Sequence, residues 1–106
     1  MLLCSLLPAL AGQRHLPWEK NSLARGQAVY RANCVVCHDI DKEKSTKFGP
    51  SFYGLFKREK MPLANMKPSR EYIQLRVQFG GDLMPAFQGK ISDADIAALI
   101  DYIASK

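Results

Sequence analysis

The run Cys34-Val35-Val36-Cys37-His38 constrains this chain more than any other feature of its sequence. The spacing C-x-x-C-H is the attachment signature for a c-type haem. Two thiols three positions apart near the end of a helix can each add to a vinyl group of the haem and leave a thioether bond. The histidine that follows is then carried beneath the ring, where its imidazole can ligate the iron. The sequence therefore predicts one covalent haem c, bound through Cys34 and Cys37 with His38 as an axial ligand.

Two other uses of paired cysteines fit this sequence less well. A thiol–disulfide redox motif usually sits in a βαβ context, and no strand pattern precedes Cys34. A zinc site needs four ligands, and the chain has no second C-x-x-C or H-x-x-x-H pair. The remaining cysteine, Cys4, lies in an apolar leader far from the motif.

The first eleven residues are uncharged and mostly apolar, and Ala9-Leu10-Ala11 has the A-x-A form of a signal-peptidase site. We therefore expect residues 1–11 to be the remnant of a signal peptide, and residues 12–106 to form a single small domain. Export to the bacterial periplasm agrees with thioether chemistry, which bacteria complete outside the cytoplasm. The alternatives are a frayed apolar N-terminus and a lipid anchor on Cys4, which would associate the chain with a membrane.

Three segments have helical patterns, and no alternating strand pattern is evident. We expect a first helix over residues 22–33, capped by Asn21 or Ser22, with Leu23, Gly26 and Tyr30 on one face. The glycine would permit close approach by another element. The intervening region is rich in proline and glycine, and we expect a short helical turn over residues 51–56 within it.

Two further helices are predicted in the C-terminal half of the chain. Ser69 is expected to cap a helix that ends near Phe79 at Gly80-Gly81. One face of this helix is made by Tyr72, Leu75 and Phe79. Ser92 is expected to cap the last helix. That helix carries an apolar stripe at i, i+3, i+4 and i+7, made by Ile96, Leu99, Ile100 and Ile103. The fold class is therefore all-α, with about three main helices and long loops wrapped around a covalently bound haem.

A methionine is expected to complete the coordination of the iron, because His/Met ligation is a recognised c-type pairing. Met84 lies in Leu83-Met84-Pro85-Ala86-Phe87, where the proline stiffens the loop and fixes how the thioether points. Met61 is also followed by proline, but its charged neighbours predict a solvated segment. Core packing is the other explanation for a methionine beside alanine and phenylalanine. We expect Met84 to be the second ligand.

With these residues in place, the chain resembles a monohaem class I cytochrome c of the compact bacterial type. The resemblance covers about residues 22–106 and rests on Gly26, Tyr30, Cys34, Cys37, His38, the run from Lys47 to Gly54, Met84-Pro85, and the run from Leu99 to Ile103. It implies that the first and last helices cross at near right angles, with Tyr102 packing where Gly26 lets it approach. It also implies that the carbonyl of Pro50 accepts the Nδ1–H of His38.

Two parts of the resemblance are incomplete. Residues 57–68 have no pattern that can be assigned within the family. The residues that contact the haem propionates are also open: Tyr53 and Arg76 are the chosen candidates, and Trp18 and Gln78 are the others.

An iron clamped by His38 and Met84 has no place for a substrate, so the expected function is single-electron transfer and not enzyme catalysis. The chain would shuttle electrons between periplasmic or membrane redox partners, such as those of a respiratory chain, and would have no small-molecule substrate. A dedicated haem subunit of a dehydrogenase or oxidase complex is the main alternative. An enzyme or gas sensor in which Met84 does not ligate is a third.

The charge pattern bears on the partner. Between residues 42 and 70 there are eight basic residues against two acidic ones, and the whole chain has a net charge of +5. This favours redox partners with acidic docking patches, although a solvated basic face without a partner is equally compatible with the sequence. Nucleic-acid binding is not expected, because the lysines are dispersed in loops without a groove-reading helix or a stacking array.

Overall fold

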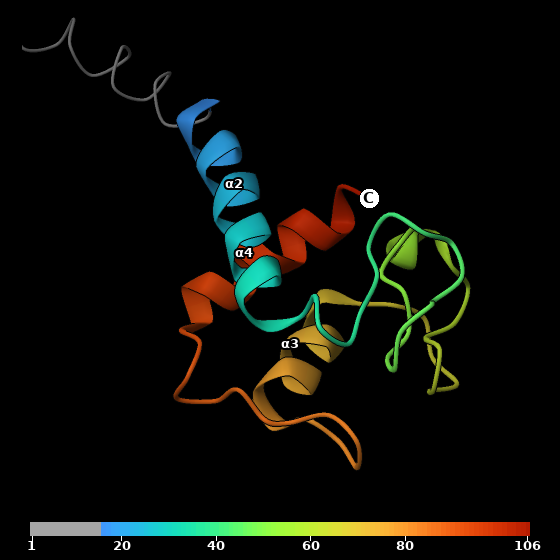
Figure 1. Ribbon diagram of the computed structural model, residues 1–106. Coiled ribbons are helices and arrows are strands. Elements are labelled where there is room, and N and C mark those ends of the chain that lie inside the picture. Colours follow the sequence, from blue (N-terminus) through green and yellow to red (C-terminus); the bar gives the residue numbers. More distant parts are fainter. Residues whose placement is uncertain (1–15) are drawn as a thin grey trace, which may run out of the picture.

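The structure is a computed structural model that describes the backbone from residue 16 and the side chains from residue 21 to residue 106. Its elements in chain order are α2 (Leu16–Asn33), the 3₁₀-helix η2 (Leu55–Lys57), α3 (Arg70–Phe79) and α4 (Asp93–Ala104) (Figure 1). Residues 16–106 contain two isolated β-bridges and no strand. The all-α class is confirmed. The expected signal-peptide remnant and Cys4 lie outside the described residues.

Helix α2 begins earlier than the sequence predicted. It already includes Leu16, so neither Asn21 nor Ser22 is its N-cap. The Ser22 hydroxyl instead donates a hydrogen bond to the carboxylate of Asp101 on α4, which gives this polar residue a use inside the helix. Leu23 is 40% exposed, so the buried face is made by Gly26 and Tyr30 as expected, together with Val29.

The caps of α3 and α4 are confirmed. The Ser69 side chain accepts a hydrogen bond from the backbone N–H of Tyr72, and the Ser92 side chain accepts one from that of Asp95. Both serines therefore satisfy a backbone donor that the first helical turn would otherwise leave free. Helix α3 ends at Gly80, whose φ of 67° is a conformation that favours glycine.

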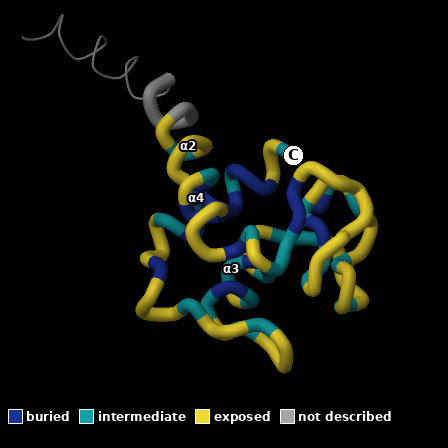
Figure 2. Tube along the Cα trace, viewed as in Figure 1, coloured by how far each residue is buried: buried dark blue, intermediate teal, exposed yellow. Residues whose placement is uncertain are grey.

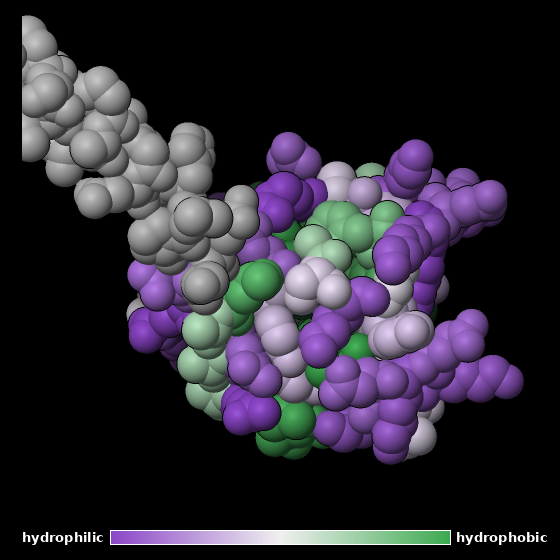
Figure 3. Space-filling view, turned by 90° about the horizontal axis from the view of Figure 1, so that it is seen from above, coloured by the Kyte–Doolittle hydropathy of each residue, from purple (hydrophilic) through white to green (hydrophobic). Residues whose placement is uncertain are grey.

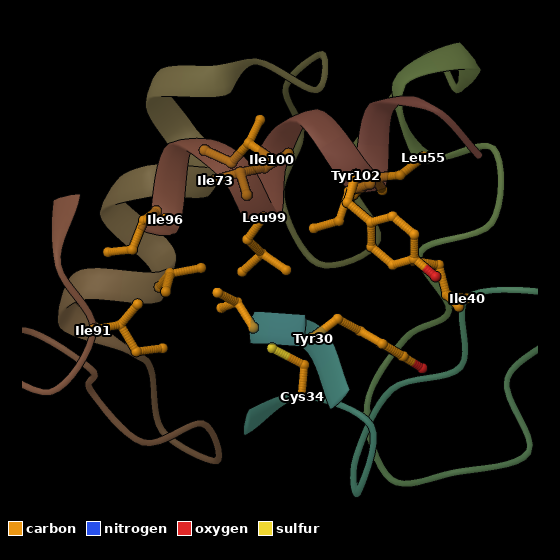
Figure 4. Close-up of a cluster of buried hydrophobic side chains, with 13 residues drawn as sticks. Tyr30, Cys34, Ile40, Leu55, Ile73, Ile91, Ile96, Leu99, Ile100 and Tyr102 are labelled. Carbon is orange, nitrogen blue, oxygen red and sulfur yellow. The ribbon is translucent and has the colours of Figure 1, made fainter. Parts of the chain in front are cut away.

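Helix α4 supplies the centre of the core. Ile96, Leu99, Ile100 and Ile103 are the largest fully buried side chains of the described residues. Burying such a side chain contributes about 1.5–3 kcal/mol. Figure 4 shows Ile96, Leu99 and Ile100 near side chains from other elements, among them Tyr30, Cys34 and Ile73. Figure 2 shows buried positions in α4 and also in parts of α2, α3 and the loops. The predicted apolar stripe is therefore the main core surface.

A glycine sets how closely α2 and α4 approach each other. A Cβ atom on Gly26 would lie 2.0 Å from the carbonyl oxygen of Ala98 and 2.7 Å from the Cβ of Tyr102. Any larger residue would collide with the backbone of α4. Figure 1 shows α4 crossing α2, so this contact fixes the crossing of the first and last described helices. The expected approach of Tyr102 to Gly26 is confirmed.

Two local features differ in detail from the predictions. The short helical turn expected over residues 51–56 is present but lies slightly later in the chain, as η2, where buried Leu55 anchors it to the core. On α3 the buried residues are Ile73 and Val77, whereas Leu75 and Phe79 are more than half exposed. Ile73 and Val77 share the side of the helix that packs on α4, and tertiary contact therefore overrides the face with the larger side chains.

Candidate haem-binding site

A largely apolar cavity of about 520 Å³ opens between the end of α2, α3, α4 and the loops that join them. This volume lies within the range of about 300–1,000 Å³ that is typical of cofactor and ligand pockets. Its lining includes Cys34, Cys37, His38 and Met84. The structure therefore brings together, on one cavity, the four residues that the sequence selected for haem attachment and ligation.

The end of α2 presents the motif to the cavity. The backbone N–H of Cys34 still donates to the carbonyl of Tyr30 (2.8 Å), and that of His38 donates to the carbonyl of Cys34 (3.0 Å). This turn buries Cys34 in the core and leaves Cys37 partly exposed. The two intervening valines point differently, because Val35 packs against the core whereas Val36 is 82% exposed.

The thiol of Cys34 is a poor match for disulfide chemistry. Burial raises the pKa of Cys34 to about 11, and the neighbouring Cys37 adds to the effect. Cysteines that work in thiol–disulfide exchange have a lowered pKa, which makes the reactive thiolate available at neutral pH. The environment of Cys34 therefore argues against the thiol-redox alternative.

His38 is held as a neutral, oriented imidazole. Burial lowers the pKa of His38, opposed by the hydrogen bond with the Pro50 carbonyl, and the nearby charge of Lys47 acts in the same direction as burial. The Nδ1 atom lies 2.7 Å from the carbonyl oxygen of Pro50. Because a carbonyl can only accept, Nδ1 carries the proton and Nε2 keeps a free lone pair. The ring also stacks on Phe52, with centroids 4.4 Å apart, and the Tyr30 hydroxyl donates to the His38 carbonyl (2.6 Å).

Two methionines, and not one, line the cavity. Met84 is placed by a tight loop in which its backbone N–H and carbonyl are paired with Gly81 (3.3 and 3.0 Å). Met61 also lines the cavity and packs, partly buried, against the core. The expected solvated segment is confirmed in part, because Glu59, Lys60 and Lys67 are exposed. The Met61 side chain itself is partly buried, in a turn closed by a hydrogen bond from its N–H to the carbonyl of Met66 (2.7 Å).

The candidate propionate contacts separate in the structure. Arg76 lines the cavity and donates to the Tyr72 hydroxyl (2.6 Å) and to the Gly80 carbonyl (3.2 Å). Tyr53 is 44% exposed and is not part of the cavity lining. Gln78 donates to the carboxylate of Asp93 (3.0 Å) on the surface. Trp18 lies where side chains are not described.

Asp39 is a residue of this site that the sequence analysis missed. It follows His38 directly and is only 6% exposed. Hydrogen bonds from Thr46, opposed by partial burial, hold the pKa of Asp39 below its usual value, and Lys47 and Lys42 act in the same direction. A signal was present in the sequence, since an acidic residue at the end of the attachment motif is followed by several lysines, but only the folded loop shows what Asp39 contacts.

The lining fits a haem. The cavity is apolar, carries two cysteines at its edge, a neutral histidine with a free ring nitrogen, and thioether sulfurs. Within residues 21–106 no group of three or more acidic, histidine or cysteine side chains is arranged to hold a bare metal ion. A histidine nitrogen together with a thioether sulfur is a donor set that suits the iron of a haem.

Comparison with known proteins gives one family match and several curated relatives. Residues 21–103 match the family described as "Cytochrome C oxidase, cbb3-type, subunit III". The chain is 31% identical to cytochrome c6 of Diacronema lutheri over 84 residues, which are 79% of this chain and 95% of the relative. It is 34% identical to cytochrome c6 of Leptolyngbya boryana over 78% of this chain and 91% of that one. The chain belongs to the cytochrome c family.

Membership of this family accounts for the cavity. The chain is a monohaem class I cytochrome c that carries one covalent haem c, and it is an electron-transfer protein that works with redox protein partners and not an enzyme. Among the described residues of this cytochrome, no helix is long and apolar enough to cross a membrane.

Proposed function

We propose that this cytochrome is a single-electron carrier in which His38 and Met84 are the two axial ligands of the haem iron and Cys34 and Cys37 form the thioethers. The observation that carries the proposal is that all four residues line one apolar cavity. When bound, the haem iron supplies reversible one-electron transfer between its ferrous and ferric states. The protein supplies the ligands, the burial and the access for a partner.

Each of these residues has a defined task. The Pro50 carbonyl fixes the tautomer and the orientation of His38, so that Nε2 faces the cavity as a ligand. Met84 offers a soft thioether, which favours the reduced metal and raises the potential relative to ligation by two histidines. Arg76 places a positive charge beside the cavity, where it can pair with a haem propionate. Tyr53, which lies outside the lining, is the weaker of the two propionate candidates.

The mouth of the cavity offers a docking surface for the redox partner. Three residues that line the cavity also have strongly exposed side chains: Phe48, Leu63 and Leu83. Lys47, Lys60 and Lys67 lie close to them in sequence. Figure 3 gives a general view of the surface from above, on which hydrophilic residues predominate and hydrophobic residues form small groups between them. An apolar rim set among cations suits a partner with an acidic patch, which includes membrane-bound redox complexes, held in a small and short-lived interface.

The apolar leader supports export. We propose that residues 1–11 are removed at Ala9-Leu10-Ala11, that residues 12–106 form the mature cytochrome domain, and that electron transfer takes place in the bacterial periplasm. N-terminal sequencing of the exported protein would test this, because a start other than Gly12 would contradict the proposed cleavage.

The ligand assignment is tested by matched methionine variants. Met84→Ala should abolish the weak far-red band that ferric iron–sulfur ligation gives, lower the midpoint potential and let the ferrous protein bind carbon monoxide. Met61→Ala is the control, because Met61 lines the same cavity but is not the proposed ligand. Loss of the band in Met61→Ala with its retention in Met84→Ala would overturn the assignment, and carbon monoxide binding by the unmodified protein would overturn the carrier function.

A dedicated subunit of a larger oxidoreductase is the second candidate. It is favoured by the matched family, which is named for a subunit of an oxidase, and by the exposed apolar rim, since obligate interfaces are more hydrophobic than transient ones. Size-exclusion chromatography of the native protein from its own membranes and soluble fraction distinguishes the two. A diffusible carrier elutes at the mass of a single chain, whereas a subunit co-elutes with its complex.

A further inference from the structure

A buried carboxylate fastens the loop over residues 42–50 to the end of the attachment motif. The Asp39 Oδ2 atom accepts hydrogen bonds from the backbone N–H of Thr46 (2.7 Å) and from its hydroxyl (2.9 Å). The Lys47 ammonium lies 3.7 Å from the other carboxylate oxygen. A buried charge needs such partners, because an unpaired one is costly. Asp39 and the loop therefore hold each other in one arrangement.

The far end of this loop carries the contact to His38. The N–H of Gly49 donates to the carbonyl of Cys37 (2.6 Å), and the N–H of Phe52 donates to the carbonyl of Asp39 (2.8 Å). Pro50 lies between these two attachments, with its carbonyl oxygen 2.7 Å from His38 Nδ1. The position of Pro50 is therefore set by the hydrogen bonds that join the loop to residues 37–39.

The loop over residues 42–50 packs tightly against the His38 ring. A Cβ atom on Gly49 would lie 2.5 Å from Cε1 of His38, so the loop backbone rests directly on the imidazole. The Lys47 ammonium also reaches back to the Val35 carbonyl (2.5 Å). A small displacement of the loop would therefore break the hydrogen bond between the Pro50 carbonyl and His38 Nδ1.

We propose that Asp39 is a positioning residue for His38: its carboxylate sets the seating of the loop that delivers the Pro50 carbonyl to the imidazole. The inference rests on the proposed function, in which His38 is the axial ligand. A firmly bonded Nδ1–H makes the imidazole a stronger electron donor. That favours ferric iron, so loosening the loop should raise the midpoint potential and expose the Nδ1 proton to solvent.

Three variants separate this role from a simple charge effect. Asp39→Ala removes both the acceptor and the charge. Asp39→Asn removes the charge but keeps an oxygen that can accept from Thr46. Asp41→Asn is the matched control, because it removes a nearby charge whose side chain is 77% exposed and pairs with Lys106. The measurements are the midpoint potential and, by NMR of the ferrous haem-loaded protein, the exchange rate of the His38 Nδ1 proton.

We expect the Nδ1 proton to exchange at least about tenfold faster in Asp39→Ala, because this variant loses both hydrogen bonds from Thr46 and the loss of a hydrogen bond to a charged group changes an equilibrium constant by about that factor or more. The midpoint potential should rise with it. In Asp39→Asn and Asp41→Asn the exchange rate should stay close to that of the unmodified protein. Equal rises of potential in the two Asp39 variants, with unchanged exchange in both, would overturn the inference and assign the effect to charge alone.

The test keeps its force under two complications. If Asp39→Ala does not fold, Thr46→Val can be used, because it removes only the hydroxyl donor to Asp39. In this variant the His38 Nδ1 proton should exchange faster than in the unmodified protein, by a smaller factor than in Asp39→Ala. An unchanged exchange rate would overturn the inference. The far-red band of the unmodified protein reports the methionine ligation separately. Its absence would refute the proposed ligand pair, while the exchange comparison would still decide whether Asp39 seats the loop.

Discussion

The guanidinium of Arg76 brings a positive charge to the edge of the cavity. This group lines an apolar cavity, and its hydrogen-bond partners there, a tyrosine hydroxyl and a backbone carbonyl, are both neutral. None of the ion pairs among the described residues involves it. Arg76 is partly buried, so its positive charge is less screened than a charge on the open surface and acts more strongly on a charge that forms nearby.

Replacement of Arg76 by glutamine should lower the midpoint potential of the bound haem, because the arginine disfavours the extra positive charge of ferric iron. Redox titration followed by absorbance measures this. Arg70→Gln is the control, since Arg70 belongs to the same helix but lies on the surface, paired with Asp101 (2.8 Å). A higher potential in Arg76→Gln, or an equal change in both variants, would contradict the proposed role.

At the residue scale, the sequence could name the chemistry but not every contact. Cys37 and His38 stand in a motif whose spacing predicts their use, and Met84 was predicted from its proline-containing apolar loop; the structure places all three on one cavity. Met61 and Asp39 could not be located in this way. Whether a methionine beside lysines turns inward depends on a loop closure, and whether an aspartate is buried depends on which donors a distant segment brings to it.

At the scale of the elements, the crossing of α2 and α4 is the central contact. It is formed at Gly26, where the carbonyl of Ala98 occupies the space that a side chain would need. An ion pair between Arg25 and Asp95 (2.8 Å) lies beside it on the surface. Exposed pairs of this kind contribute little, so close packing carries most of the stability of the crossing.

Gly26→Ala should therefore destabilise the protein by about 2–3 kcal/mol, the cost typical of forcing extra atoms into a packed interface. Alanine is otherwise the better helix former, so the sign of the effect identifies the crossing as its cause. Urea unfolding of the haem-loaded protein gives the free energy. Ala24→Gly, at an exposed position of the same helix, should cost only about 1 kcal/mol; an equal or smaller loss in Gly26→Ala would contradict the packing argument.

Helices were predictable where a cap and an apolar period agree. Ser69 and Ser92 begin α3 and α4 as expected, because a serine before a periodic segment satisfies a backbone donor. The start of α2 and the buried face of α3 were not predictable in this way. On α3 the deciding partner is α4, which covers Ile73 and Val77, and local sequence does not contain that partner. On α2 the Ser22 hydroxyl bonds to Asp101 of α4 and does not cap the helix.

At the scale of the whole molecule, the excess of positive charge should govern how partners are met. The net charge is +5, and eight basic residues fall between positions 42 and 70. A summed field of this sign attracts acidic surfaces over distances at which no specific contact exists. The field is screened by salt, with a Debye length of about 10 Å at 0.1 M ionic strength.

The rate of electron transfer to an acidic protein partner should fall steeply as ionic strength increases. Stopped-flow oxidation by a negatively charged redox protein measures this. An uncharged small-molecule oxidant is the control, because its encounter with the protein has no charge term and its rate should stay nearly constant. Equal salt dependence for both oxidants would contradict electrostatic docking.

The contact of Gly26 with Ala98 also bears on how the molecule is produced. Because it joins the first and last described helices, the pair cannot close until α4 has emerged from the ribosome or from a translocation channel. Until then the core that buries Cys34 lacks the side chains of α4. The order of synthesis therefore leaves an interval in which Cys34 can react with haem before α4 completes the core over it.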